Sequence, residues 1–140
     1  MRMLVMALLA MLVSLSSCVS NDQPRYLLKV QKIAREVAAD MDFKDPQPIV
    51  TLVSDTHWSL PGRGAQAAAS LDSQGQGWIY IRRSHELNSA PFIRGLLYHE
   101  FAHLQTWRTY GVKVRMHGPE FSFVCRQYTS RKNCATTYID

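Results

Sequence analysis

Residues 90–111 of this 140-residue chain read APFIRGLLYHEFAHLQTWRTYG, and this stretch decides the fold. Its apolar residues recur at intervals of three and four, which predicts an amphipathic helix that begins near Pro91. Gly111 predicts the end of that helix, because glycine is favoured directly after the last helical turn. The chain is 46% hydrophobic and 19% charged, which is typical of one globular domain rather than of a disordered segment.

The predicted helix contains the pattern H-E-x-x-H at residues 99–103. Residues four apart lie one turn apart on the same helix face, so the imidazoles of His99 and His103 can bind one metal ion. Glu100 follows the first histidine directly, and its carboxylate can act on a water molecule rather than on the metal. These residue types at this spacing predict a zinc site with Glu100 as the catalytic base.

A third histidine, His117, follows His103 by fourteen residues, beyond the predicted helix end at Gly111. The chain can turn back there and bring His117 to the metal, which would leave the fourth position that a catalytic zinc keeps open. Glu120 is an alternative third ligand, since some metalloproteases use a glutamate from a later helix. It also suits the positive N-terminus of its own helix.

The remaining pattern predicts an α+β fold, a zincin-like domain in which a small antiparallel sheet packs with the 90–111 helix and two or three other helices. A first helix is expected from a cap at Asn21 or Asp22 to about Met41. Residues 49–53 and 78–81 are expected to be strands, residues 66–71 are ambiguous, and another helix is expected near residue 119.

The N-terminus has the features of an export signal. A short positive start precedes an apolar run from Leu4 to Val13, which is too short to span a bilayer. The following Leu15-Ser16-Ser17-Cys18 resembles the lipobox of bacterial lipoproteins, which implies a signal peptide over residues 1–17 and lipidation of Cys18. Residues 18–24 would then be a tether, and residues 25–140 the folded domain.

This reading places the protein in the bacterial cell envelope. Val19 stands where lipoproteins retained in the inner membrane carry an aspartate, which favours the outer membrane facing the periplasm. Exported proteins keep disulfides, so Cys125 and Cys134, nine positions apart, can form a bridge or remain two thiols.

The sequence His99-Glu100-x-x-His103, followed by His117-Gly118-Pro119-Glu120-Phe121, resembles the SprT-like family of zinc metalloproteases. A helix, a Gly-Arg stretch and a strand also precede the motif in the family's order. The resemblance implies a zincin-like fold, a zinc cofactor, His117 as the third ligand and hydrolysis of peptide bonds.

Two features distinguish this chain from members of the family that act on proteins crosslinked to DNA. The chain ends soon after the core without a nucleic-acid-binding or zinc-ribbon segment, and the export signal directs it away from the chromosome. We therefore expect a protein or peptide substrate and no nucleic acid partner, and the sequence does not decide between a folded protein and a cell-wall peptide. The alternative is a catalytically inactive zinc-binding module that binds or assembles partner proteins in the envelope.

Several further residues are candidates for supporting roles. Tyr98, Tyr110 and Tyr128 are candidates to stabilise the oxyanion, and sequence does not rank them. His57-Trp58 can line a substrate cleft, whereas His85 is not expected to be a ligand. Six Lys or Arg residues against one acid over 104–135 can face anionic lipid headgroups or simply be solvated.

Overall fold

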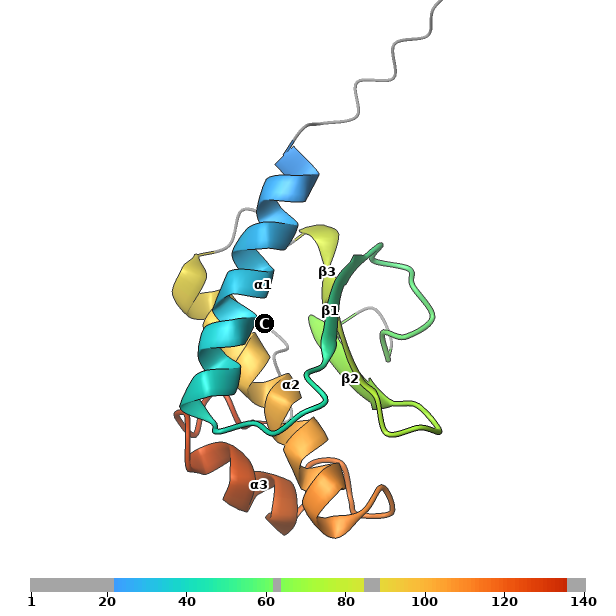
Figure 1. Cartoon of the computed structure of the whole chain (residues 1–140), viewed down its shortest axis with the longest axis vertical. Coiled ribbons are helices and arrows are strands. Elements are labelled where there is room, and N and C mark those ends of the chain that lie inside the picture. Colours follow the sequence, from blue (N-terminus) through green and yellow to red (C-terminus); the bar gives the residue numbers. More distant parts are fainter. Residues whose placement is uncertain (1–21, 62–63, 85–88, 136–140) are drawn as a thin grey trace, which may run out of the picture.

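The computed structural model describes residues 22–61, 64–84 and 89–135, and it is of the α+β class, as predicted (Figure 1). Helices and a three-stranded sheet alternate in a simple order along the chain. The elements are α1 (Asp22–Asp40), β1 (Ile49–Val53), β2 (Ala67–Leu71), β3 (Gly77–Arg82), α2 (Ala90–Tyr110) and α3 (Pro119–Arg126).

The sheet has the strand order β1-β3-β2 and is mixed, so the expectation of an antiparallel sheet was wrong. β2 and β3 are antiparallel because a tight turn joins them, in which the Asp72 carboxylate accepts hydrogen bonds from the N–H groups of Gln74 and Gln76. β1 runs parallel to β3. After β1 the chain passes to the opposite edge of the sheet, where it forms β2. It then turns back into β3, which fills the central position and runs in the same direction as β1.

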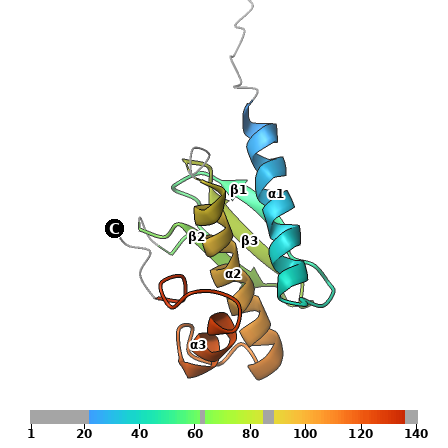
Figure 2. The same ribbon diagram turned by 90° about the vertical axis from the view of Figure 1, so that its left-hand side faces the viewer.

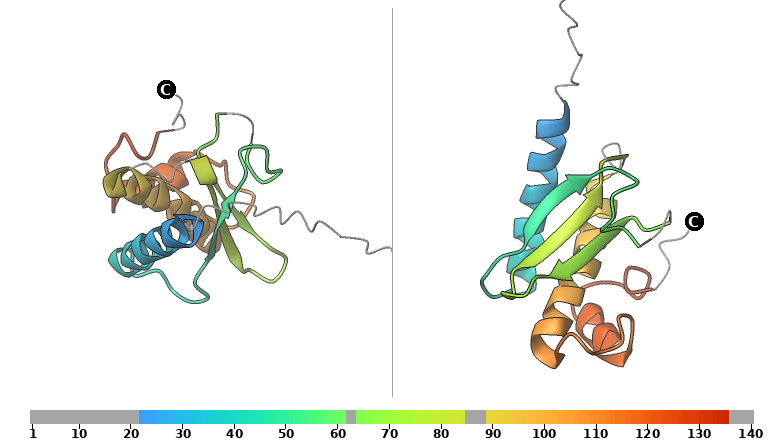
Figure 3. Two further views of the ribbon diagram at one scale, coloured as in Figure 1. Left: turned by 90° about the horizontal axis from the view of Figure 1, so that it is seen from above. Right: turned by 90° about the vertical axis from the view of Figure 1, so that its right-hand side faces the viewer.

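The helices α1 and α2 cover one face of the sheet, and no helix of the described residues covers the other face (Figure 3). The alternation along β3 separates these faces, because Ile79 and Ile81 are fully buried under the helices whereas Trp78 and Tyr80 lie on the opposite face. Each fully buried aliphatic or aromatic side chain contributes about 1.5–3 kcal/mol. Phe101 of α2 is at the centre of this core.

Polar contacts fix α1 beside α2, which Figure 2 shows from the side. Arg94 of α2 forms an ion pair with Glu36 of α1, and the Tyr98 hydroxyl donates to the Asp40 carboxylate at 2.6 Å. The helix α2 starts with a cap, since the Ser89 hydroxyl accepts from the N–H of Phe92.

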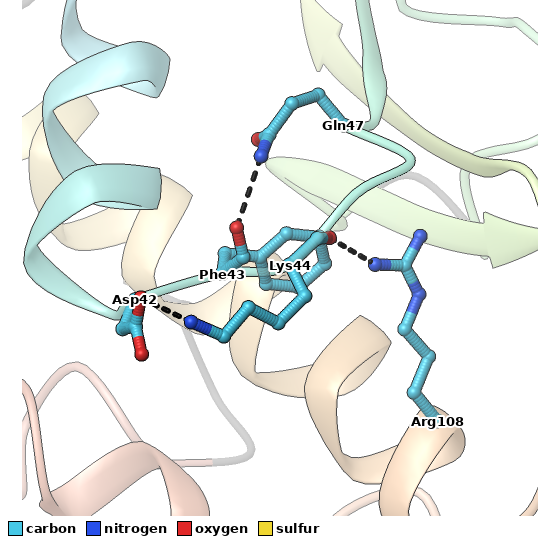
Figure 4. A network of polar contacts seen from close by, with 5 residues as sticks. All are labelled: Asp42, Phe43, Lys44, Gln47 and Arg108. Carbon is cyan, nitrogen blue, oxygen red and sulfur yellow. Dashed lines mark hydrogen bonds and ion pairs between the residues drawn. The ribbon is translucent and has the colours of Figure 1, made fainter.

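The other end of α2 holds the segment between α1 and β1 (Figure 4). The Arg108 guanidinium donates to the carbonyl oxygens of Lys44 and Pro46 at 2.8 and 2.7 Å, and it lies 4.5 Å from the centre of the Phe43 ring. α2 is therefore anchored at both ends, and its middle turns cannot slide relative to the sheet.

The predicted signal peptide (1–17), Cys18 and the tether as far as residue 21 lie outside the described residues. The helix α1 begins at Asp22, so residues 22–24 are helical where the sequence analysis placed the end of the tether. Among the described residues, none of the helices combines the length and apolar character needed to cross a bilayer.

Candidate metal centre

Three histidine side chains converge on one point between α2 and α3. The Nε2 atoms of His99 and His103, one turn apart on α2, are 3.1 Å from each other. The Nε2 atom of His117 is 3.1 Å from that of His99 and 3.2 Å from that of His103. The structure therefore brings together the three imidazoles selected from the sequence, and a group of this kind could hold a metal ion.

His117 reaches this point because two glycines shape the segment after α2. Gly111 has a φ of 87°, a conformation that side chains other than glycine's rarely adopt, and it ends the helix. Gly118 is the N-cap of α3, and its N–H donates to the carbonyl oxygen of Arg115 in a turn around His117. The ring of Phe121, one turn into α3, then stacks on His103 with centroids 4.2 Å apart.

The geometry of the three nitrogens fits a tetrahedral cation. Ligands at the zinc–nitrogen distance of about 2.0–2.1 Å in a tetrahedron are separated by about 3.3–3.4 Å, close to the separations seen here. The Nδ1 atom of His99 is 2.7 Å from the carbonyl oxygen of Asn133, so Nδ1 carries the proton and Nε2 presents its lone pair to the centre.

Burial keeps the three imidazoles in the neutral form that binds metals. Loss of solvation lowers the pKa of His99 to about 4, against a small opposing effect of the hydrogen bond to Asn133. Loss of solvation also lowers the pKa of His103 and His117, and the neighbouring imidazoles lower that of His103 further. All three are therefore unprotonated near neutral pH, and a metal would not have to displace protons from them.

Glu100 is fully enclosed beside the first ligand. Burial raises the pKa of its carboxyl to about 8, opposed by a hydrogen bond from the backbone of Ala69 on β2. It forms no ion pair with any residue in the described part of the chain. A cation held by the histidines would favour its ionised form.

Asn133 is a functional residue that sequence reasoning missed. It acts through its backbone carbonyl, which any residue type could supply, so no side-chain signal marks it. The indirect signal is its neighbour, because Cys134 forms a disulfide with Cys125 of α3 and ties the segment to the centre. The bridge that the sequence left open is therefore present in the structure.

The alternative third ligand and the tyrosine candidates lie elsewhere. The carboxylate of Glu120 lies beside Gly118 at the start of its own helix, and the ligand cluster found among residues 22–61, 64–84 and 89–135 contains histidines alone. The Tyr98 hydroxyl donates a hydrogen bond to the Asp40 carboxylate on α1. Tyr110 is 46% exposed in the last turn of α2, about 10 Å along the helix from His103.

The remaining candidates are not brought to the centre. His57 stacks on Tyr80, and the ring of Trp58 is tilted against Tyr80, on the outer face of the sheet away from α2. Of the basic residues, Arg108 binds backbone carbonyls of the segment after α1. Two candidates, His85 and Cys18, lie outside the described residues. Tyr128 packs against the core.

Comparison with known proteins gives one match. The model of the SprT-like family matches residues 55–139, more than half of the chain. The matched range includes β2, β3, the H-E-x-x-H helix, His117 and the disulfide, and it excludes α1 and β1. No curated protein and no solved structure matches the chain significantly.

Proposed function

Because the chain belongs to the SprT-like family, we propose that it is a zinc-dependent metallopeptidase that hydrolyses peptide bonds, with Glu100 as the general base. The observation that carries this proposal is the convergence of three neutral imidazole nitrogens, 3.1–3.2 Å apart, next to a buried carboxyl without an ion-pair partner in the described residues. A neutral tri-histidine set with one open position is the ligand set of a catalytic zinc.

Each residue of the centre has a separate role in this proposal. His99, His103 and His117 would hold the ion through their Nε2 atoms, and the Asn133 carbonyl keeps His99 in the required tautomer. The chemistry that zinc supplies when bound is that of a Lewis acid, which acidifies water and polarises a carbonyl oxygen. The ionised Glu100 carboxylate accepts a proton from the attacking water and donates it to the nitrogen of the leaving amine.

The free edge of β2 supports a peptide substrate. The N–H of Arg82 donates to the carbonyl of Gln66, so the antiparallel pairing leaves the N–H and C=O groups of Ala67, Ala69 and Leu71 pointing away from β3. No described strand pairs with this edge. The N–H of Ala69 donates to Glu100, which places this edge beside the carboxyl. The groups of Ala67 and Leu71 and the Ala69 carbonyl can still form backbone hydrogen bonds with an extended peptide.

We further propose that the enzyme is anchored to the bacterial envelope through lipid on Cys18 and acts on protein or peptide substrates there. The support is the signal-like sequence of residues 1–17 and the small residues before Cys18. Cys18→Ser should move the protein from the membrane fraction to the soluble fraction and abolish incorporation of labelled fatty acid. An unchanged membrane fraction would contradict the anchor.

The enzymatic proposal is tested by Glu100→Gln, with Glu120→Gln as the matched control. Glu100→Gln should keep one zinc per chain and lose at least roughly 100-fold in kcat/KM on an unfolded protein substrate, the contribution typical of a general base. Glu120→Gln should keep both zinc and activity. Equal activity of Glu100→Gln and the wild type would overturn the proposal, and zinc binding with no peptidase activity in the wild type would favour the non-catalytic envelope module.

A further inference from the structure

We propose that the outer face of the sheet carries a binding site for a neutral glycan chain. The site is an aromatic platform, by which we mean the rings of His57, Trp58, Trp78 and Tyr80. It goes beyond the proposed peptidase function, because it requires neither the metal nor Glu100.

The alternation along β3 creates the platform. Trp78 and Tyr80 are two positions apart, so both side chains lie on the face opposite to the buried Ile79 and Ile81. Their ring planes are 8° apart and their centroids are 6.3 Å from each other, so the two rings lie nearly parallel along the strand. His57 continues this row of rings, stacked on Tyr80 with a centroid distance of 5.7 Å.

The loop after β1 adds a fourth ring and holds it in place. The ring centroid of Trp58 is 5.2 Å from that of His57 and 6.0 Å from that of Tyr80. The Nδ1 atom of His57 lies 2.7 Å from the Ser59 hydroxyl, so the loop is tied on the side away from the sheet. Trp58 is nevertheless 81% exposed, an unusual state for the largest apolar side chain.

Most neighbours of the platform on the adjacent strands are small, and the exception is Ile49 of β1, which lies opposite Trp78 and is 43% exposed. Thr51 of β1 and Ala68 of β2 lie opposite Tyr80, and Ser70 of β2 lies opposite Trp78. A ligand that rests on the rings would have the hydroxyl groups of Thr51 and Ser70 at its two sides. Figure 3 shows that this face points away from α2, so the platform is separate from the metal centre.

The charge around the rings argues for a neutral occupant. Arg82, the next residue on this face, has a side chain that is only 12% exposed. Its guanidinium is 4.0 Å from the Asp55 carboxylate and donates to the carbonyl of Ala65. Nucleic acids bind through exposed Lys and Arg at their phosphates, and the described platform residues offer none.

Sugar rings have the complementary chemistry. A pyranose presents a face of C–H groups, which suits the negative face of an aromatic ring, and a rim of hydroxyls, which suits polar side chains such as Thr51 and Ser70. A linear glycan would place sugars on the exposed ring of Trp58 and on Trp78. If the proposed export is correct, such polymers surround the protein in the envelope, and the platform would hold the peptidase near peptides attached to them.

The test uses the full chain and two probes, chitotetraose in calorimetric titrations and purified peptidoglycan sacculi in sedimentation at high salt. The wild type should bind both. Trp58→Ala and Trp78→Ala should each weaken binding roughly tenfold, the loss expected when one buried aromatic contact is removed. Phe123→Ala is the matched control, because it removes a 63% exposed ring from α3, and its binding should equal that of the wild type.

Trp58→Ala decides the question if Trp78→Ala fails to fold, because the Trp58 side chain is largely in solvent. The proposal is overturned if the wild type binds neither probe, if Trp58→Ala binds as well as the wild type, or if a single-stranded deoxythymidine oligomer binds the platform more tightly than the glycans do. Zinc content and the effect of Glu100→Gln are measured on the same preparations, so failure of the glycan site and failure of the peptidase proposal can be told apart.

Discussion

The ring of His99 is held in one tautomer by a backbone carbonyl, and this contact decides which of its nitrogens faces the centre. The Asn133 carbonyl oxygen accepts a hydrogen bond from the Nδ1–H of His99 at 2.7 Å, so the Nε2 lone pair is left for a metal. Burial lowers the pKa of His99 to about 4 and removes proton competition at neutral pH. At the scale of single residues, the centre is therefore preorganised for a cation.

His117→Ala is the residue-scale test of the third ligand. Its Nε2 is 3.1 Å from that of His99, so its loss should weaken zinc binding by more than the roughly 10- to 100-fold typical of residues behind the ligands. Competition with a chromophoric chelator measures the affinity. Glu120→Gln should leave it unchanged, and the opposite pattern would make Glu120 the third ligand.

A second residue-scale prediction concerns protons released on zinc binding. Without a cation nearby, burial raises the pKa of Glu100 to about 8, so its carboxyl is mostly protonated at pH 7. A bound cation favours the carboxylate, so zinc should displace this proton, and affinity should rise with pH up to about 8. Calorimetry in buffers of different ionisation heats should show about one proton fewer released by Glu100→Gln than by the wild type. Equal release would contradict the assignment.

The residues of the metal centre that act through their side chains could be predicted from the sequence. The spacing of His99, Glu100 and His103 follows from helix geometry, and His117 was the next histidine after a helix end. Asn133 could not be predicted, because a carbonyl carries no sequence signal. The aromatic platform could not be predicted either. Trp58 and Tyr80 are far apart in the sequence and become neighbours only when the loop after β1 folds over the sheet.

At the scale of elements, the disulfide joins α3 to the segment that carries Asn133. Cys134 follows Asn133 directly and is bonded to Cys125. Gly95 of α2 allows this segment to approach, because a Cβ there would lie 3.0 Å from the Asn133 side chain. The bridge therefore supports the metal centre as well as the fold.

Replacing both cysteines by serine should affect the protein in two ways. Loss of a bridge across nine positions should cost about 2–3 kcal/mol of unfolding free energy, measured with urea. Release of the Asn133 carbonyl from His99 should weaken zinc binding roughly 10-fold. Gly95→Ala should weaken zinc binding without removing the bridge. Unchanged affinity in both variants would mean that the Asn133 contact does not support His99.

Elements with a clear pattern were predicted well, including the short strands at 49–53 and 78–81, which correspond to β1 and β3. The apolar spacing of α1 and α2 indicated helices because the signal repeats over several turns. The alanine-rich stretch 67–71 had no preference of its own, and it is a strand because β3 pairs with it. The parallel pairing of β1 with β3 depends on the path of the long connection, which local sequence does not encode.

At the scale of the whole molecule, the centre links parts that are far apart in the chain. His99 and His103 come from α2, His117 from the next connection, and Asn133 from the segment after α3. The unfolded chain does not hold these groups together, so a metal held by them would bind the folded state and stabilise it.

Zinc should therefore raise the melting temperature of the protein. Free zinc at 100 times its dissociation constant adds about 2.7 kcal/mol to the free energy of unfolding, which is roughly 10 °C for a domain of this size. Scanning fluorimetry with zinc and with a chelator measures the shift. His103→Ala should show almost no zinc-dependent shift, and a wild type that melts at the same temperature with and without zinc would contradict a folded metal site.

The most direct measurement is X-ray absorption at the zinc edge of the reconstituted full-length protein. We expect three imidazole nitrogens at about 2.0–2.1 Å with one oxygen ligand, and one imidazole fewer in His117→Ala. A spectrum with sulfur ligands, or one that His117→Ala leaves unchanged, would contradict this ligand set.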